Sequence, residues 1–343
     1  MKRLLNTLYV TGTNRYLSLD GENVVVLEER EEIGRVPLHN LQGIVTFGYT
    51  GASPALMAAC AQRNIDLTFM SGNGRFLARV TGEVKGNVTL RKQQYRISED
   101  KDKSIRIARN FIFGKVYNAR WILERAARDY PMRLNADKLK EKSAFLYNSL
   151  QEIRVCENAS KLLGLEGEAA SVYFSVFDQL ILQQKENFSF RERSRRPPLD
   201  NVNAMLSFAY SLLAGMCGSA LEGVGLDPYV GFYHTDRPGR ISLALDMMEE
   251  LRGIMADRFV LTMINKRIVK KGHFIQKENG AVILNDSGRK LFLNAWQERK
   301  QDMIKHPFLN EKIEWGMVPH AQAILMARYL RGDLDEYPPF LWK

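Results

Sequence analysis

The sequence predicts an α+β protein, with a small β-rich N-terminal domain followed by a larger C-terminal all-α domain. The chain has 343 residues, more than a single hydrophobic core usually holds, so two domains are expected. Short β-branched and aromatic runs fill residues 1–85, and apolar residues recur with helical spacing from about residue 100. With 45% hydrophobic and 26% charged residues, the composition excludes collagen-like, disordered and disulfide-scaffold proteins.

The β-rich domain, residues 1–85, is expected to consist of short strands and one helix. The expected strands are residues 7–11, 16–19, 24–27, 43–47, 67–70 and 76–80. Asp20-Gly21 separates the second strand from the third and predicts a hairpin turn. Ser53-Pro54 is a typical N-cap and first-turn pair and predicts a helix over residues 55–60. Two glycines between residues 82 and 88 suit a short linker.

The helical domain, residues 90–343, is predicted from long segments with few helix breakers. These segments are residues 103–129, 157–183, 204–220 and 242–268. Asn279-Gly280 and the turn at residues 286–288 predict a hairpin-like insertion before a helix that begins near Arg289.

The cysteines and the N-terminus argue against an exported or membrane protein. Cys60, Cys156 and Cys217 form no CxxC pair and have apolar or small neighbours, which favours buried thiols over disulfides or a structural zinc site. Asn6 and Thr7 interrupt any signal-like apolar segment. We also expect no uncharged stretch close to the roughly 20 apolar residues of a membrane span. The sequence therefore predicts a cytoplasmic protein without a membrane span.

Positive charge is concentrated in the helical half. Residues 1–85 hold 9 basic and 8 acidic side chains and the remainder holds 40 and 31, so the helical half carries +9 of the net charge of +10. Residues 91–120 alone hold nine Lys and Arg. Tyr95, Phe111 and Phe113 lie among them and could stack on bases or pack in the core. A polyanion is thus a reasonable partner, although a solvated basic face is the simpler interpretation.

Carboxylates and one histidine of this half are candidate metal ligands. On a helix, one face would carry Asp246, Glu249, Glu250, Gly253 and Asp257. Like charges this close repel one another unless a cation or basic groups lie against them. His234 precedes a Pro-Gly turn, from which it could project into a cleft, although a structural histidine is the more common case. Oxygen ligands with one imidazole suit Mg²⁺ or Mn²⁺, and the histidine favours Mn²⁺.

Glu166 lies on another predicted helix. The expected apolar stripe of this helix leaves Glu166, Ala170 and Tyr173 on an adjacent strip. The small residues beside Glu166 would let a ligand or another segment approach closely. Taken alone, Glu166 is interpreted as a surface carboxylate.

Four segments together resemble the motifs of the CRISPR-associated endonuclease/integrase of spacer acquisition. They are residues 165–174 around Glu166, residues 195–208 with Asn203, residues 231–234 ending in His234, and residues 246–252. They follow the family's order, and the resemblance covers essentially the whole chain. Four motifs in the right order are far more specific than any one of them.

The resemblance implies a catalytic metal site for Mg²⁺ or Mn²⁺, made by Glu166, His234 and Glu249. Many relatives have Asp where this chain has Glu249, whose arm is longer. Asp246 matches a second acidic position of the family, near the metal or supporting it.

Other motif positions are expected to support the same site. Asn203 and Arg252 would lie behind the ligands or contact phosphate. Whether Asp246, Glu168 or Glu250 joins the metal shell stays open at this stage.

The implied activity is integration of DNA in prokaryotic adaptive immunity. A 3′-hydroxyl of a captured fragment attacks a phosphodiester at the edge of a CRISPR repeat, and the same site could run hydrolysis or the reverse reaction. The resemblance also implies double-stranded DNA as substrate and a homodimer joined through the β-rich domain. Two such dimers would flank a dimer of the small ferredoxin-like adaptation partner in a hetero-hexamer. The alternatives are a standalone metal-dependent nuclease or branched-DNA resolvase, and a non-catalytic DNA-binding scaffold.

Overall fold

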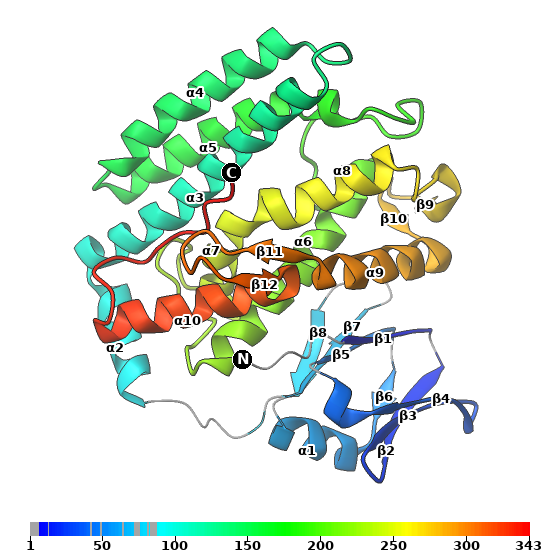
Figure 1. Cartoon of the computed structure of the whole chain (residues 1–343). Coiled ribbons are helices and arrows are strands. Elements are labelled where there is room, and N and C mark those ends of the chain that lie inside the picture. Colours follow the sequence, from blue (N-terminus) through cyan, green and yellow to red (C-terminus); the bar gives the residue numbers. More distant parts are fainter. Residues whose placement is uncertain are drawn as a thin grey trace.

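Strands and helices are segregated along the chain (Figure 1). The computed structural model describes residues 7–12, 14–41, 43–48, 50–63, 65–71, 76–80, 82 and 88–343. Strands dominate up to β8, and helices dominate from α2 onward, which confirms the predicted α+β class. Most of the linker expected between residues 82 and 88 lies outside the described residues.

Two four-stranded sheets form the N-terminal region. Their strands are β1 (Thr7–Thr11), β2 (Arg15–Asp20), β3 (Asn23–Glu28), β4 (Glu31–Pro37), β5 (Gly43–Phe47), β6 (Gly51–Ala52), β7 (Asp66–Met70) and β8 (Phe76–Val80). One sheet has the order β1-β5-β7-β8, with β8 antiparallel to its neighbour and the other pairs parallel. The other has the order β4-β3-β2-β6.

Turn chemistry explains how these elements begin and end. Gly21 has a positive φ of 56° in the β2–β3 hairpin, a backbone conformation in which glycine carries no steric penalty. The Ser53 hydroxyl accepts a hydrogen bond from the Leu56 amide at the start of α1 (Pro54–Arg63). The sequence thus predicted the hairpin and the helix correctly, and it missed β4 and β6.

The helical region contains nine α-helices among the described residues 88–343. They are α2 (Val88–Glu99), α3 (Lys101–Asp129), α4 (Ala136–Arg154), α5 (Ala159–Ser175), α6 (Asn201–Gly223), α7 (Ser242–Leu251), α8 (Arg258–Asn265), α9 (Asp286–Gln301) and α10 (Val318–Arg331). Two short antiparallel pairs accompany them, β9 (Phe274–Gln276) with β10 (Val282–Leu284) and β11 (Met303–Lys305) with β12 (Lys312–Glu314). The first pair is the predicted hairpin-like insertion, but residues 286–288 are the first turn of α9 and not a separate turn before it.

Polar side chains cap several of these helices. The Asp100 side chain accepts hydrogen bonds from two amides at the start of α3. The side chains of Asn158 and Asp200 each accept one, at the starts of α5 and α6. The helix predicted over residues 242–268 is interrupted, because residues Arg252–Asp257 between α7 and α8 form a π-helical segment. Helices α2, α4 and α10 were not predicted.

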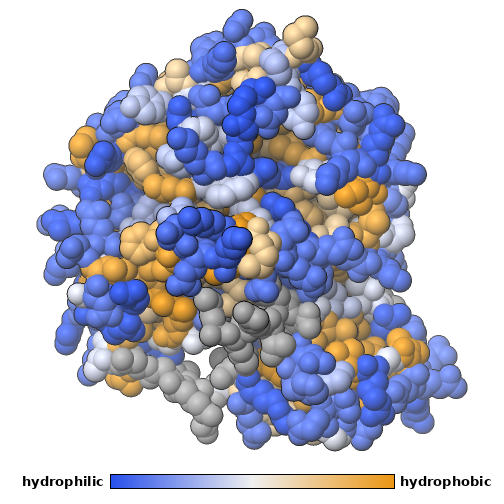
Figure 2. All heavy atoms as spheres, in the orientation of Figure 1, coloured by the Kyte–Doolittle hydropathy of each residue, from blue (hydrophilic) through white to orange (hydrophobic). Residues whose placement is uncertain are grey.

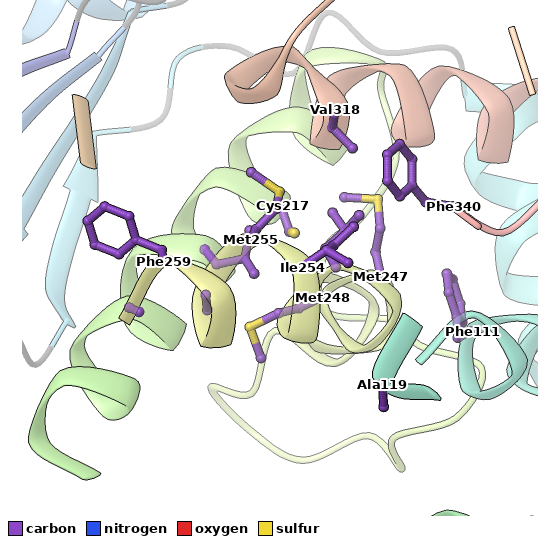
Figure 3. Close-up of a cluster of buried hydrophobic side chains, with 14 of the residues drawn as sticks. Phe111, Ala119, Cys217, Met247, Met248, Ile254, Met255, Phe259, Val318 and Phe340 are labelled. Carbon is purple, nitrogen blue, oxygen red and sulfur yellow. The ribbon is translucent and has the colours of Figure 1, made fainter. Parts of the chain in front are cut away.

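The main hydrophobic core lies among the helices. Figure 3 shows side chains from several elements meeting around α7, including Phe111 from α3, Cys217 from α6, Val318 from α10 and Phe340 from the C-terminal segment. A second cluster lies within the strand region. Phe47 of β5 belongs to the helical core and packs against the ring of Phe208 at 5.8 Å between centroids, which joins the two regions.

Helix α6 corrects one expectation from the sequence. It spans 23 residues with a mean hydropathy of 1.5 over its most apolar window, so it is long and apolar enough to cross a membrane. However, 67% of that window is buried inside the protein, as in the core helix of a soluble domain. The face in Figure 2 is mostly hydrophilic, with smaller apolar areas between the charged side chains. All three cysteines are free and buried, as predicted.

Candidate active site

The acidic residues of α7 and its π-helical continuation are buried. Asp246 and Glu250 have no exposed surface, and Glu249 and Asp257 are 3% and 2% exposed. Basic groups lie against Glu249, as the repulsion between the predicted carboxylates required. The other carboxylates, Asp246, Glu250 and Asp257, are instead held by hydrogen bonds. The helix is covered on all sides and changes its winding after Leu251, so each carboxylate meets a different set of partners.

Glu249 meets Glu166 around the ammonium of Lys115. Lys115 Nζ lies 2.7 Å from Glu249 Oε2 and also donates to Glu166 Oε1. Glu249 Oε1 pairs with Arg252 Nη2 at 2.8 Å. The three helices α3, α5 and α7 thus each contribute one charged side chain to a single cluster, which is 4–17% exposed at these side chains. Glu166 is a half-buried, paired carboxylate and not the surface group that its own helix suggested.

The charges of this cluster govern its protonation. Burial alone would raise the pKa of Glu249, but the positive charges of Arg252 and Lys115 outweigh it and lower that pKa to about 2. Burial raises the pKa of Tyr233, and the nearby charges of Glu166 and Glu249 raise it further. Glu249 is therefore ionised and Tyr233 is a neutral phenol at neutral pH.

Close packing of α3 on α7 brings Lys115 to this position. A Cβ atom on Gly114 would lie 2.8 Å from the Cβ of Glu250 and 3.2 Å from the Cβ of Pro339. Because glycine has no Cβ, the two helix backbones can approach each other here. Lys115, the next residue, then reaches Glu249 on the facing helix.

His234 is held by the buried carboxylate of Asp246. Asp246 accepts hydrogen bonds from the amides of Phe232, Tyr233 and His234 at 2.7, 2.9 and 2.9 Å. Its Oδ1 atom also lies 2.6 Å from His234 Nδ1. With Asp246 accepting at Nδ1, the ring presents Nε2 as its free lone pair. Asp246 is therefore a positioning residue for His234.

The loop before His234 requires glycine at its closest approach to Asp246. A Cβ atom on Gly231 would lie 2.8 Å from Asp246 Oδ2 and 2.8 Å from the Cβ of Ser242. The glycine lets the loop wrap around the carboxylate so that three successive amides point at it.

Asn203 and Arg252 lie at opposite ends of one buried polar chain. Asn203 has no exposed surface and accepts from Arg193 Nη1 at 2.6 Å. The guanidinium groups of Arg193 and Arg252 lie over the ring of Tyr210, 5.2 and 4.7 Å from its centroid. The Tyr210 hydroxyl donates to Asp257 Oδ1 at 2.6 Å. Asn203 therefore acts through Arg193 and Tyr210, while Arg252 contacts Glu249 directly.

Glu250 and Glu168 lie apart from the cluster. Gln322 Nε2 and the Tyr337 hydroxyl donate to Glu250 Oε1, and the Phe340 amide donates to Oε2 at 2.7 Å. Burial raises the pKa of Glu250 to about 7, against the opposing effect of these hydrogen bonds. Glu168 is exposed to solvent. Glu250 thus fastens the C-terminal segment to α7.

The aromatic residues of the basic segment divide between core and surface. Phe111 is fully buried, whereas Tyr95 is 38% exposed and donates a hydrogen bond to Asp227. Of these two residues, only Tyr95 has a ring that is exposed enough to stack on a base.

The donor set fits a hard divalent cation, although the cluster is closed around Lys115. Two carboxylates and an imidazole are suitable ligands for Mg²⁺ or Mn²⁺. Glu249 Oε2 is buried and accepts no hydrogen bond of good geometry from any described residue. Within the described ranges, however, no group of three or more His, Cys, Asp or Glu side chains is gathered closely enough to hold a metal. The ammonium of Lys115 occupies the place between Glu166 and Glu249 where their charges converge.

Sequence reasoning counted Lys115 among nine basic residues and did not single it out. Its neighbours could have done so, because Lys115 stands in an otherwise apolar run between Phe111 and Val116. A lone lysine on the core side of a helix requires a buried acidic partner.

Comparisons with known proteins identify the family. A model of "CRISPR associated protein Cas1" matches residues 8–298. The chain is 48% identical over 343 residues to "CRISPR-associated endonuclease Cas1 1" of Chlorobaculum tepidum, with both chains covered completely.

Two solved structures have the same fold. A casposase bound to integration product matches with a TM-score of 0.83 and 24% identity, covering 98% of this chain and 94% of that one. A Cas6-RT-Cas1–Cas2 complex matches with a TM-score of 0.82 and 21% identity, covering 100% of this chain and 36% of that one. Since the family model spans most of the chain and a relative matches it from end to end, this protein belongs to the Cas1 family of CRISPR-associated endonucleases.

Proposed function

We propose that the protein is a metal-dependent DNA integrase and endonuclease that inserts short captured fragments into a CRISPR array. One observation carries the proposal: the carboxylates of Glu166 and Glu249, from helices α5 and α7, converge on a single cation. His234 lies near Glu249, because it is one of the groups that lower the pKa of that carboxyl, and Asp246 fixes its ring.

Glu166, Glu249 and His234 Nε2 would hold Mg²⁺ or Mn²⁺. Such an ion, when bound, polarises a phosphoryl oxygen and lowers the pKa of an attacking hydroxyl. Asp246 keeps the His234 proton on Nδ1, and Arg252 holds Glu249 in place through its Oε1 atom. The buried packing behind these residues limits access of water from the protein side.

The proposed reaction is a transesterification. The 3′-oxygen of the incoming fragment forms a bond to phosphorus as the bond from that phosphorus to the target 3′-oxygen breaks. The proton lost by the attacking hydroxyl is matched by the proton gained by the leaving 3′-oxygen. One phosphodiester replaces another, so no external energy source is needed, and water in place of the hydroxyl gives hydrolysis.

Double-stranded DNA and a second Cas protein are the proposed partners. The fold matches a casposase bound to integration product and the Cas1 part of a Cas6-RT-Cas1–Cas2 complex. The net charge of +9 on the helical half supports contacts to DNA phosphates that do not depend on sequence. We further propose a cytoplasmic homodimer joined through the strand region, with two dimers flanking a small ferredoxin-like partner, because two ends must be joined at a fixed spacing.

A strand-transfer assay tests this proposal. Purified protein, with and without the small partner, is incubated with a labelled 3′-hydroxyl fragment and a repeat-containing duplex in Mg²⁺ or in Mn²⁺. We expect joined products that disappear with Glu166→Ala or His234→Ala, while Glu168→Ala, on the exposed side of the same helix, retains them. Joining that persists in either site variant would show that the site is wrongly assigned.

The same assay separates the two alternatives. Hydrolysis products that dominate without any need for the partner would favour a standalone nuclease or resolvase. A DNA footprint that survives chelation, with neither joining nor cleavage, would favour a non-catalytic scaffold.

A further inference from the structure

We propose that Lys115 is an internal counter-cation that closes the site of the free protein, so that a divalent ion binds only by expelling the Lys115 ammonium. This inference rests on the proposed function, because it takes Glu166, His234 and Glu249 as the metal ligands.

The geometry places one cation where another would bind. Lys115 Nζ contacts an oxygen of both Glu166 and Glu249, and the Glu249 oxygen that it faces has no hydrogen bond of good geometry within the described chain. The ammonium therefore donates a hydrogen bond to Glu166, while it balances Glu249 mainly by its charge. A divalent ion between the same oxygens would repel Lys115 at close range.

Lys115 is the cation that can leave this cluster, and Arg252 is the one that stays. The side chains of Lys115 and Arg252 are each 15% exposed, so exposure does not distinguish them. Arg252 pairs with Glu249 Oε1 and lies over the Tyr210 ring. Among the described residues, the Lys115 ammonium contacts only the two carboxylates, at the end of a flexible four-carbon stem. Expelling Lys115 opens both ligands at once, while Glu249 keeps its orientation.

The charge balance favours this exchange only when an ion of sufficient charge is available. With Lys115 in place, two cations face the carboxylates of Glu166 and Glu249, so the cluster is neutral. Replacing one positive charge by two makes it positive, which suits a site that next receives a phosphodiester. Breaking two partly buried ion pairs costs free energy, which is subtracted from the free energy of metal binding. The DNA-free protein therefore binds the metal more weakly.

Isothermal titration of DNA-free protein with Mn²⁺ tests the proposal without measuring activity. We expect Lys115→Met to bind Mn²⁺ about tenfold or more tightly than the unmodified protein, because no ammonium has to be displaced. Methionine preserves the unbranched stem and removes only the charge. The matched control is Lys103→Met, because Lys103 lies on the same helix, has a side chain that is 62% exposed, and pairs with Asp100. This control should leave the dissociation constant unchanged.

A second measurement uses the unmodified protein, so it does not depend on the folding of a variant. An amine-reactive acylating reagent labels lysines, and mass spectrometry of peptides reports each site. We expect Lys115 to be protected without metal and to become labelled as Mn²⁺ is added, along the same saturation curve as the titration. Labelling of Lys103 should stay constant and serves as the internal reference.

The outcomes separate this inference from the proposed function. Equal Mn²⁺ affinity of Lys115→Met and the unmodified protein, or a Lys115 that stays protected at saturation, would overturn the role of Lys115 and leave the metal site intact. If neither protein binds Mn²⁺, or if His234→Ala binds it as tightly as the unmodified protein, the metal site itself is wrong and the role of Lys115 fails with it.

Discussion

Replacing Asp246 by Asn tests whether this carboxylate orients His234 and keeps its Nε2 atom free to bind the proposed metal. Asp246 is fully buried and accepts two amides at Oδ2 and a third at Oδ1, beside His234 Nδ1. An Asn side chain can keep one oxygen toward the Phe232 and Tyr233 amides. Its NH₂ group then faces the His234 amide, leaving that donor without an acceptor.

The expected loss of stability follows from the number of hydrogen bonds that Asp246→Asn breaks. One buried amide left unsatisfied costs about 1–3 kcal/mol, and loss of the charge weakens the remaining bonds, so we expect a destabilisation of about 2–4 kcal/mol. The Asn NH₂ group also favours the His234 tautomer that accepts at Nδ1 and carries its proton on Nε2. Nε2 then has no lone pair for a metal, so strand transfer should be lost even where the variant is still folded.

Urea unfolding measures the stability of Asp246→Asn, and strand transfer measures its activity under conditions where the variant is folded. Asp129→Asn is the control, because Asp129 is 47% exposed and pairs with its neighbour Arg128, so its loss should change stability by less than about 0.5 kcal/mol. An Asp246→Asn protein with unchanged midpoint and normal strand transfer would refute the proposed positioning of His234.

Three further substitutions probe the packing and the protonation behind the site. Gly114→Ala should lower the free energy of unfolding in urea by about 1–3 kcal/mol, because the added methyl group would lie 2.8 Å from the Cβ of Glu250 and push α3 away from α7. An unchanged unfolding midpoint would show that the two helices move apart without cost. The pKa of Glu250 is about 7 in the folded protein, above its ordinary value of 4.5, so the folded state binds the proton more tightly. The stability from this group is full below pH 4.5 and is lost as pH rises to about 7, a loss of about 3 kcal/mol. Glu250→Gln should remove that slope relative to the unmodified protein, and parallel stability–pH curves of the two proteins would contradict the assignment. Tyr210→Phe should lose about 1–2 kcal/mol in the same assay with its hydrogen bond to Asp257, while the ring still packs against Arg252; no loss would mean that water replaces the hydroxyl.

Local chemistry made the strand region predictable. The Asp20-Gly21 turn and the Ser53-Pro54 helix start each depend on residues adjacent in sequence, and both form where they were expected. Strand β4 was missed because three of its seven residues are charged, Gly34 and Pro37 disfavour a strand, and it lies on an exposed edge of the sheet.

The candidate site was less predictable, because its partners come from distant helices. The helical spacing of Asp246, Glu249 and Glu250 was predicted correctly, but periodicity cannot show that α7 is buried on all sides or that it passes into a π segment before Asp257. On α5, Tyr173 was expected beside Glu166, whereas it is 4% exposed and donates to Asp257. Such contacts depend on tertiary packing, which single-helix patterns do not contain.

The attachment of the C-terminal segment bears on the order in which the protein folds during synthesis. Asn118 on α3 donates a hydrogen bond to the carbonyl of Phe340, 222 residues further along the chain. The same amide group donates to the carbonyl of Glu250, so one side chain of α3 links α7 to that late segment. Helix α3 leaves the ribosome long before either partner, and contacts of such long range are slow to form. A nascent chain therefore carries its basic helices well before the packing behind Glu249 can be complete, so the Glu166–Glu249 cluster is among the last parts of the protein to assemble.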